Sequence, residues 1–177
     1  TALHLPDFRA SERTFQLIAQ VAGRAGRSEQ KGRVIVQTFT PDDPAITLAS
    51  RHDFEAFAAQ ELETRRGAGL PPIARMARIV VRDKDLIACT ARARELHDHL
   101  TAANASLFPE PRRVRIRPPS PCAISRIADY HRHQIEMIAA PPDAAARLQR
   151  LLASLRQTRL LISDLHTAVD MDPVSLL

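Results

Sequence analysis

The chain has 177 residues, of which 45% are apolar, so it is long and apolar enough to bury a core and is not a disordered tail. No run approaches the roughly 18 apolar residues of a membrane span and no signal peptide opens the chain, so we expect a soluble, cytoplasmic protein with no membrane partner. The formal net charge is +5, and because residues 1–70 hold nine basic and nine acidic side chains, the whole excess lies in residues 71–177.

The first part of the chain is predicted to form a helix, a strand and a second helix. Residues 10–24 place apolar side chains at helical spacing, and residues 34–39 form a short β-branched run. Asp42 or Asp43 then caps the second helix, whose apolar side chains extend to Leu62.

The strongest break in the pattern is the pair Pro71 and Pro72. It coincides with the step in charge and follows a long helical segment that ends in glycines. We therefore place a domain boundary near residues 67–72, between a domain of residues 1–70 and one of residues 71–177.

The second domain is predicted to follow the order strand, helix, strand, strand, helix, strand. The expected elements cover residues 76–81, a helix from Asp83 or Asp85 to Leu100, residues 114–116, 135–139, 148–155 and 161–171. Two strand–helix–strand units joined by a hairpin form a compact α+β sandwich with both helices on one face of the sheet. Cys89 falls on the apolar stripe of the first of these helices, which favours a core residue over a reactive thiol.

Residues 20–27 read QVAGRAGR and contain the pattern Q-x-x-G-R-x-x-R. Arg24 and Arg27 lie three apart at the end of a helix, so both guanidinium groups project from one side, while Gly23 and Gly26 allow close backbone approach. Two such arginines suit a polyphosphate, because they can neutralise the charge that develops on a transferring γ-phosphoryl group. The same pair also suits a solvated helix end whose cations complement the helix dipole.

The run of residues 7–20 that leads into this pattern resembles the last conserved motif of superfamily 2 helicases, as written in the primosomal replication-restart helicases (primosomal protein N-prime). Residues 32–38, 61–66 and 169–173 resemble the same family in the same order. The resemblance covers essentially the whole chain, most strongly up to residue 78 and at the end.

The resemblance implies ATP-dependent 3′-to-5′ DNA unwinding in replication restart at stalled forks. Residues 1–70 would be the end of the second RecA-like lobe, an α/β fold, and the rest a C-terminal βαββαβ sandwich similar to a small ribosomal-protein fold (S10-like). The residues implied in contacts with the γ-phosphate of ATP are Gln20, Gly23, Arg24 and Arg27, with Arg24 and Arg27 as the catalytic arginines.

No G-x-x-x-x-G-K-[ST] loop occurs in the sequence, so little in it can hold a triphosphate. We therefore expect a carboxy-terminal fraction of the helicase that is inert alone and that uses ATP and Mg²⁺ only when the remainder of the helicase polypeptide supplies the other lobe. Two alternatives stay open: a stand-alone nucleic-acid-binding module with a remnant helicase motif, and a structural adaptor without a ligand. An in-frame Walker-type loop encoded immediately upstream would favour the helicase.

Arginines alternate along the third predicted element of the second domain, where they could track the backbone of forked or single-stranded DNA. The candidate nucleic-acid contacts are Arg113, Arg115, Arg117, Arg126, Arg132 and Gln134. A charged edge strand that keeps the protein soluble would show the same pattern. The family has aromatic residues at the positions of His131 and His133, so we expect weaker base stacking here. No third ligand accompanies these histidines, so we predict no metal site.

Two further pairs have simpler interpretations. Asp170 and Asp172 are expected to cap the end of the last strand rather than to act in acid–base chemistry. Gln149 and Arg150 lie on the exposed side of the last predicted helix, where a basic group suits the acidic tail of single-stranded-DNA-binding protein, a partner that the resemblance implies.

Overall fold

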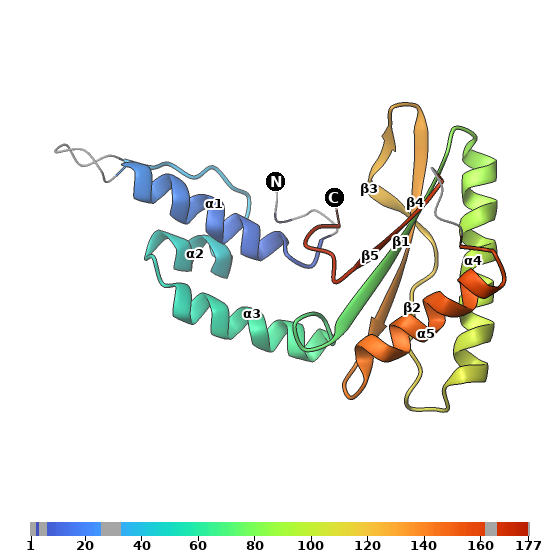
Figure 1. The fold of residues 1–177 in the computed structure, drawn as a ribbon. Coiled ribbons are helices and arrows are strands. Elements are labelled where there is room, and N and C mark those ends of the chain that lie inside the picture. Colours follow the sequence, from blue (N-terminus) through green and yellow to red (C-terminus); the bar gives the residue numbers. More distant parts are fainter. Residues whose placement is uncertain (1–2, 4–6, 26–32, 162–165, 177) are drawn as a thin grey trace. The chain divides into compact units, whose positions relative to one another are not determined.

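The computed structural model describes residues 3, 7–25, 33–161 and 166–176. The chain divides into two compact units, Thr1–Gly67 and Ala68–Leu177, whose elements are labelled in Figure 1. In the described part of the chain, no helix combines the length and the apolar character that crossing a membrane requires.

The first unit is helical, with elements α1 (Ala10–Ala25), α2 (Pro44–Ser50) and α3 (Phe54–Ala68). Phe15 of α1 is 4% exposed and stacks on Phe57 of α3, with ring centroids 4.4 Å apart. Ala45 and Ala49 of α2 complete this small core. The helix predicted over residues 10–24 is confirmed.

The strand predicted for residues 34–39 is wrong. Residues 33–40 are described and have no strand pairing, and Ile35 and Phe39 are 82% and 94% exposed. A strand needs a neighbouring strand to take up its backbone hydrogen bonds, and none of the described residues of this unit lies in one. The β-branched run therefore has no regular secondary structure, and most of its side chains are exposed to solvent.

The single helix predicted after Asp43 is two helices. Asp43 caps α2, because its Oδ1 accepts a hydrogen bond from the Ala45 amide at 2.8 Å. The chain then turns at His52, which has φ 54°, and Asp53 accepts a hydrogen bond from the Ala56 amide at 3.0 Å. This second cap starts α3 in a new direction.

The second unit is an antiparallel sheet with two helices (Figure 1). Its elements are β1 (Arg75–Asp83), α4 (Leu86–Leu107), β2 (Arg115–Ile116), β3 (Ser120–Ile127), β4 (Tyr130–Ala139), α5 (Ala144–Gln157) and β5 (Thr167–Met171). The strand order is β2-β4-β1-β5, and β3 also pairs with β4. The last strand is shorter than predicted: Leu161 is not part of it, and residues 162–165 lie outside the described residues.

β2 and β3 together form one interrupted edge strand along β4. β2 pairs with one half of β4, where Arg115 lies opposite Ile138, and β3 pairs with the other half, where Ile127 lies opposite Tyr130. The prolines at 118 and 119 separate them, because proline donates no hydrogen bond to a ladder. The sequence predicted only the first part of this edge; the α+β class is confirmed, with β2 and β3 where one strand was predicted.

The core of this unit lies between the sheet and the two helices, since alternate side chains of each strand point to one face. Its most buried members, each at most 2% exposed, are Ala77, Ile79, Val81, Cys89, Ala93, Leu96, Leu100, Ile135, Met137, Ala139, Leu148, Leu151, Leu152 and Leu155. Both helices therefore cover the same face, as predicted, and Cys89 is a core residue. Burial raises the pKa of its thiol, despite hydrogen bonds that lower it.

Two buried polar side chains hold the segment that leads into β2. The Asn104 amide of α4 donates to the Val114 carbonyl at 2.7 Å, and its Oδ1 accepts from the Val114 amide at 3.0 Å. Arg147 of α5 is 5% exposed and donates to the carbonyls of Arg112, Ala140 and Pro142. The arginines of this segment therefore have a defined backbone position.

The end of β5 is fastened to the start of β1. Asp172 accepts a hydrogen bond from the Met76 amide at 3.1 Å and forms an ion pair with Arg75. Burial raises the pKa of Asp172, but the hydrogen bonds and the charge of Arg75 outweigh it, so the pKa lies below its ordinary value. Asp170 lies 3.5 Å from Arg78. The predicted strand-end role of this pair is confirmed for Asp172.

Candidate functional site

Gln20 and Arg24 lie on the exposed side of α1, away from the buried face that carries Phe15. They are four residues apart, so their side chains are neighbours on the helix surface. Arg24 is exposed in the last turn and has no ion pair with any described carboxylate. Gly26 and Arg27, the other predicted members of this site, lie outside the described residues.

Gly23 lies in α1 between these two side chains. A Cβ added there would meet no atom within 4 Å, so the packing of the described residues does not require a glycine. A glycine inside a helix costs about 1 kcal/mol relative to alanine. The side-chain amide of Gln20 and the guanidinium of Arg24 are therefore the groups of α1 that can donate hydrogen bonds to a ligand.

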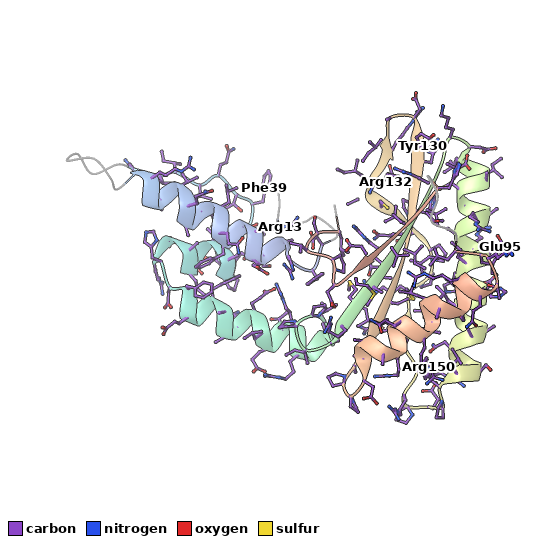
Figure 2. All side chains as sticks on the ribbon, viewed as in Figure 1. Arg13, Phe39, Glu95, Tyr130, Arg132 and Arg150 are labelled. Carbon is purple, nitrogen blue, oxygen red and sulfur yellow. The ribbon has the colours of Figure 1, made fainter. Side chains whose placement is uncertain are left out.

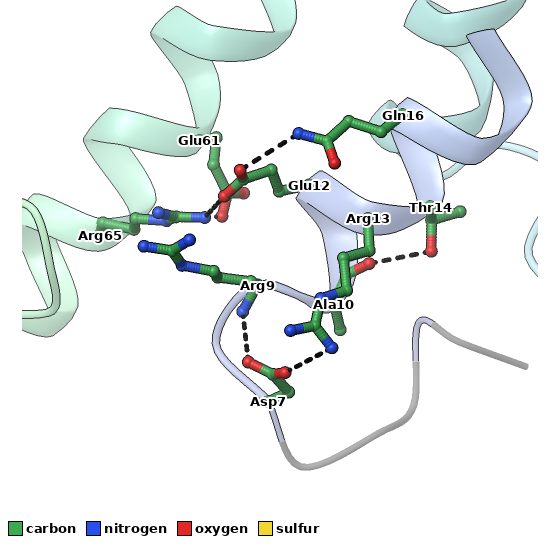
Figure 3. A network of polar contacts seen from close by, with 9 residues as sticks. All are labelled: Asp7, Arg9, Ala10, Glu12, Arg13, Thr14, Gln16, Glu61 and Arg65. Carbon is green, nitrogen blue, oxygen red and sulfur yellow. Dashed lines mark hydrogen bonds and ion pairs between the residues drawn. The ribbon is translucent and has the colours of Figure 1, made fainter. Parts of the chain in front are cut away.

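A polar network fixes the position of α1 (Figure 3). Arg65 of α3 is 6% exposed, and its guanidinium donates to Glu12 and to Glu61, each at 2.8 Å. At the start of the helix, Arg13 forms an ion pair with Asp7 at 3.0 Å. Breaking a buried ion pair is expensive, so these contacts hold the helix that carries the motif.

The arginines around β2 do not form a row along one strand, contrary to the sequence prediction. β2 contains only Arg115 and Ile116, because the chain is held by other contacts on either side. Arg113 forms an ion pair with Glu110 at 3.1 Å, and the guanidinium of Arg115 donates to the carbonyls of residues 68 and 69 at 3.1 and 3.2 Å. These two side chains are therefore engaged within the domain.

Arg117 and Gln134 meet at Glu136, which is 6% exposed. Arg117 forms an ion pair with Glu136 at 2.8 Å, and the Gln134 amide donates to it at 3.0 Å. Gln134 is itself only 5% exposed, so its predicted contact with a nucleic acid has little surface to use. Both contacts stay predictions.

Arg126 and Arg132 lie on the hairpin that β3 and β4 form. The Arg126 side chain is 61% exposed and pairs with Asp129 at 3.2 Å. Arg132 is partly exposed and donates to the Ile124 carbonyl at 3.0 Å. Figure 2 shows Arg132 close to Tyr130 at this end of the sheet.

His131 and His133 do not face solvent as a stacking surface would. Along β4 they alternate with Arg132 and share the side of Ile135, which packs on the helices. His133 is 9% exposed, and its Nδ1 lies 3.6 Å from the Cys89 sulfur. Burial lowers the pKa of His133, with smaller effects of His131 and Arg94. The weaker base stacking expected at these positions stays a prediction.

Tyr130 has cationic neighbours that the sequence analysis did not assign. The guanidinium carbon of Arg82 lies 5.8 Å from the ring centroid, and the Lys84 Nζ lies 5.6 Å from it. Only the register between β1 and β4 brings these side chains together. No group of three potential metal ligands occurs among the described residues.

A concave surface lies beside α5. It is lined by Leu107, Phe108, Pro109, Arg112, Asp143, Ala146, Arg147 and Arg150. The Arg150 guanidinium carbon lies 5.0 Å from the ring centroid of Phe108, and Gln149 is exposed beside it, as predicted.

Comparison with known proteins identifies the family of the chain. Residues 66–174 match the family described as Primosomal protein N C-terminal domain. The chain belongs to this family. It is 35% identical over 178 residues to "Replication restart protein PriA" of Bacillus subtilis, covering 98% of this chain and 21% of the relative. It is 37% identical to "Replication restart protein PriA" of Treponema pallidum, covering 100% of this chain and 26% of the relative.

The chain thus spans about a fifth to a quarter of the length of these PriA relatives. The resemblance seen in the sequence is confirmed. The stretch that matches the Primosomal protein N C-terminal domain contains Tyr130 and all the candidate nucleic-acid residues, whereas Gln20 and Arg24 precede it.

Proposed function

We propose that this chain is the carboxy-terminal part of an ATP-dependent 3′-to-5′ DNA helicase that acts in replication restart. The first unit is the end of a RecA-like lobe, and the second is an S10-like domain that contacts forked or single-stranded DNA. The observation that carries the proposal is the exposed pair Gln20 and Arg24, one helical turn apart, with no described ion pair that would occupy Arg24. The family membership supports the same role.

The donors of α1 act on a nucleotide that the other lobe holds. ATP with Mg²⁺ supplies the phosphoryl group that is transferred to water. Gln20 donates a hydrogen bond to a γ-phosphate oxygen, and Arg24 and Arg27 neutralise the negative charge that spreads over those oxygens as the bond to the leaving group breaks. The network around Arg65 holds α1 in place while this happens.

The test uses the reconstituted helicase, with this chain joined to the amino-terminal lobes of the family. Arg24→Ala and Arg27→Ala should each reduce ATP turnover about 10³-fold and leave nucleotide affinity nearly unchanged, because an arginine finger acts mainly in the transition state. Arg51→Ala, at an exposed turn residue, is the matched control and should have no effect. Normal turnover in both motif variants would contradict the assignment.

The concave surface at α5 fits an acidic tail such as that of single-stranded-DNA-binding protein. Leu107 and Phe108 provide an apolar floor and Arg150 provides a cation at its rim, whereas Arg112 forms an ion pair with Asp143 of the same lining. A fluorescent acidic peptide should bind the chain, and Arg150→Ala should weaken binding while Arg156→Ala, an exposed control on the same helix, should not.

A further inference from the structure

Three cations and one aromatic ring gather at one end of the sheet, on the face opposite α4 and α5. Arg82 lies directly opposite Arg132 in the β1–β4 register. Tyr130 is two residues before Arg132 and therefore shares its face, and the Lys84 ammonium group lies 5.6 Å from the Tyr130 ring centroid. We call these four residues the Tyr130 patch.

Two of the three cations of the patch, Lys84 and Arg132, have no carboxylate partner among the described residues. Side chains directly opposite each other in an antiparallel pair are about 5 Å apart at Cβ, and like charges there repel. Arg132 donates to a carbonyl, which does not neutralise its charge, and neither Arg132 nor Lys84 has an ion pair with a described carboxylate. Asp83 shares the other face with His131 and lies 3.6 Å from the His166 ring. An anion bound beside Lys84 and Arg132 would balance their charges.

The Tyr130 ring indicates which kind of anion the patch would bind. Tyr130 is partly exposed, and two cations within 6 Å of its centroid hold it at the sheet end. Ile127, which lies opposite Tyr130 on β3, is 48% exposed and extends the apolar surface. A single nucleic-acid strand offers both complementary groups, phosphates for the cations and an unpaired base for the ring.

We propose that the Tyr130 patch is the single-strand contact of this domain, where a base stacks on Tyr130 and the phosphates on either side of it bind Arg82, Lys84 and Arg132. The proposal rests on the DNA-binding role given above and names its residues. It moves the main contact from the segment around β2, where Arg113 and Arg117 form ion pairs, to this end of the face opposite α4 and α5.

The chain carries its own probe for this contact, because Tyr130 is its only tyrosine and it has no tryptophan. The full 177-residue chain is titrated with an oligothymidylate of about 16 nucleotides at about 50 mM salt, and tyrosine emission is recorded beside the anisotropy of the labelled strand. Free N-acetyltyrosinamide corrects for absorption by the DNA. We expect quenching that saturates together with the anisotropy.

Binding without any change in emission would overturn the patch and leave the DNA-binding role intact, whereas no binding even at the lowest salt would overturn both. Poly-glutamate is the competing anion. If it quenched the Tyr130 emission more strongly than the DNA does, the inference that the ligand is a nucleic acid would be overturned.

Variants test the separate groups. Arg82→Gln and Lys84→Gln should each reduce the slope of log affinity against log salt by about 0.7, the value for one phosphate of a single strand. Tyr130→Leu should weaken binding about tenfold and Tyr130→Phe should keep it, since stacking needs the ring and not the hydroxyl. Arg156→Gln, which removes an exposed charge from α5, is the control and should leave the slope unchanged. Wild-type affinity in Tyr130→Leu, or equal loss in Tyr130→Leu and Tyr130→Phe, would refute stacking.

Discussion

Asn104 is expected to be the most sensitive polar side chain of the second unit. It is 7% exposed and satisfies both backbone groups of Val114, which is 3% exposed. Asn104→Ala would leave a buried amide and a buried carbonyl without partners, each at a cost of about 1–3 kcal/mol. The higher helix propensity of alanine returns about 0.5 kcal/mol. We therefore expect a loss of about 1.5–5.5 kcal/mol in the free energy of unfolding.

Urea unfolding of the full chain, followed by the emission of Tyr130, measures this loss, because the only tyrosine lies in the second unit. Asn104→Asp should be at least as destabilising, since it loses the donor and places a charge against the Val114 carbonyl. Ser106→Ala, at an exposed position of the same helix, should change stability by no more than about 0.5 kcal/mol. If Asn104→Ala were as mild as this control, the segment before β2 would not depend on these hydrogen bonds.

Two further changes test the remaining arguments. Gly23→Ala should stabilise the first unit by about 0.5–1 kcal/mol, because alanine favours a helix and the added Cβ meets no atom within 4 Å. Thermal unfolding monitored by circular dichroism measures this change. A lower melting temperature would show that Gly23 has a contact that the described residues lack. The pKa of His133 is lowered from 6.5 in the folded chain, so the imidazole binds a proton more readily in the unfolded chain. The second unit should therefore keep its stability above pH 6.5 and lose stability as the pH falls below that value. His133→Gln should flatten this part of the melting-temperature profile, and an unchanged profile would refute the role of His133.

Hydrophobic periodicity was sufficient to predict those helices and strands that bury one face. The stripe through Cys89 and Leu96 and the alternation of residues 135–139 predicted the helices, the strands and the face that both helices cover. The motif at residues 20–27 and its neighbours were sufficient to predict the family, because they depend on the order of residues along the chain alone.

Contacts between distant segments decided the rest. Residues 33–40 have the composition of a strand but no strand to pair with among the described residues of their unit, and β3 pairs with β4 although Pro121 lies within it. The Tyr130 patch exists because the register of β1 and β4 sets Arg82 opposite Arg132. Register and pairing depend on which backbone groups find partners across the fold. The amino-acid sequence by itself therefore determined the family and the elements with a clear apolar stripe, and only the tertiary structure determined the remaining strands and which charges meet.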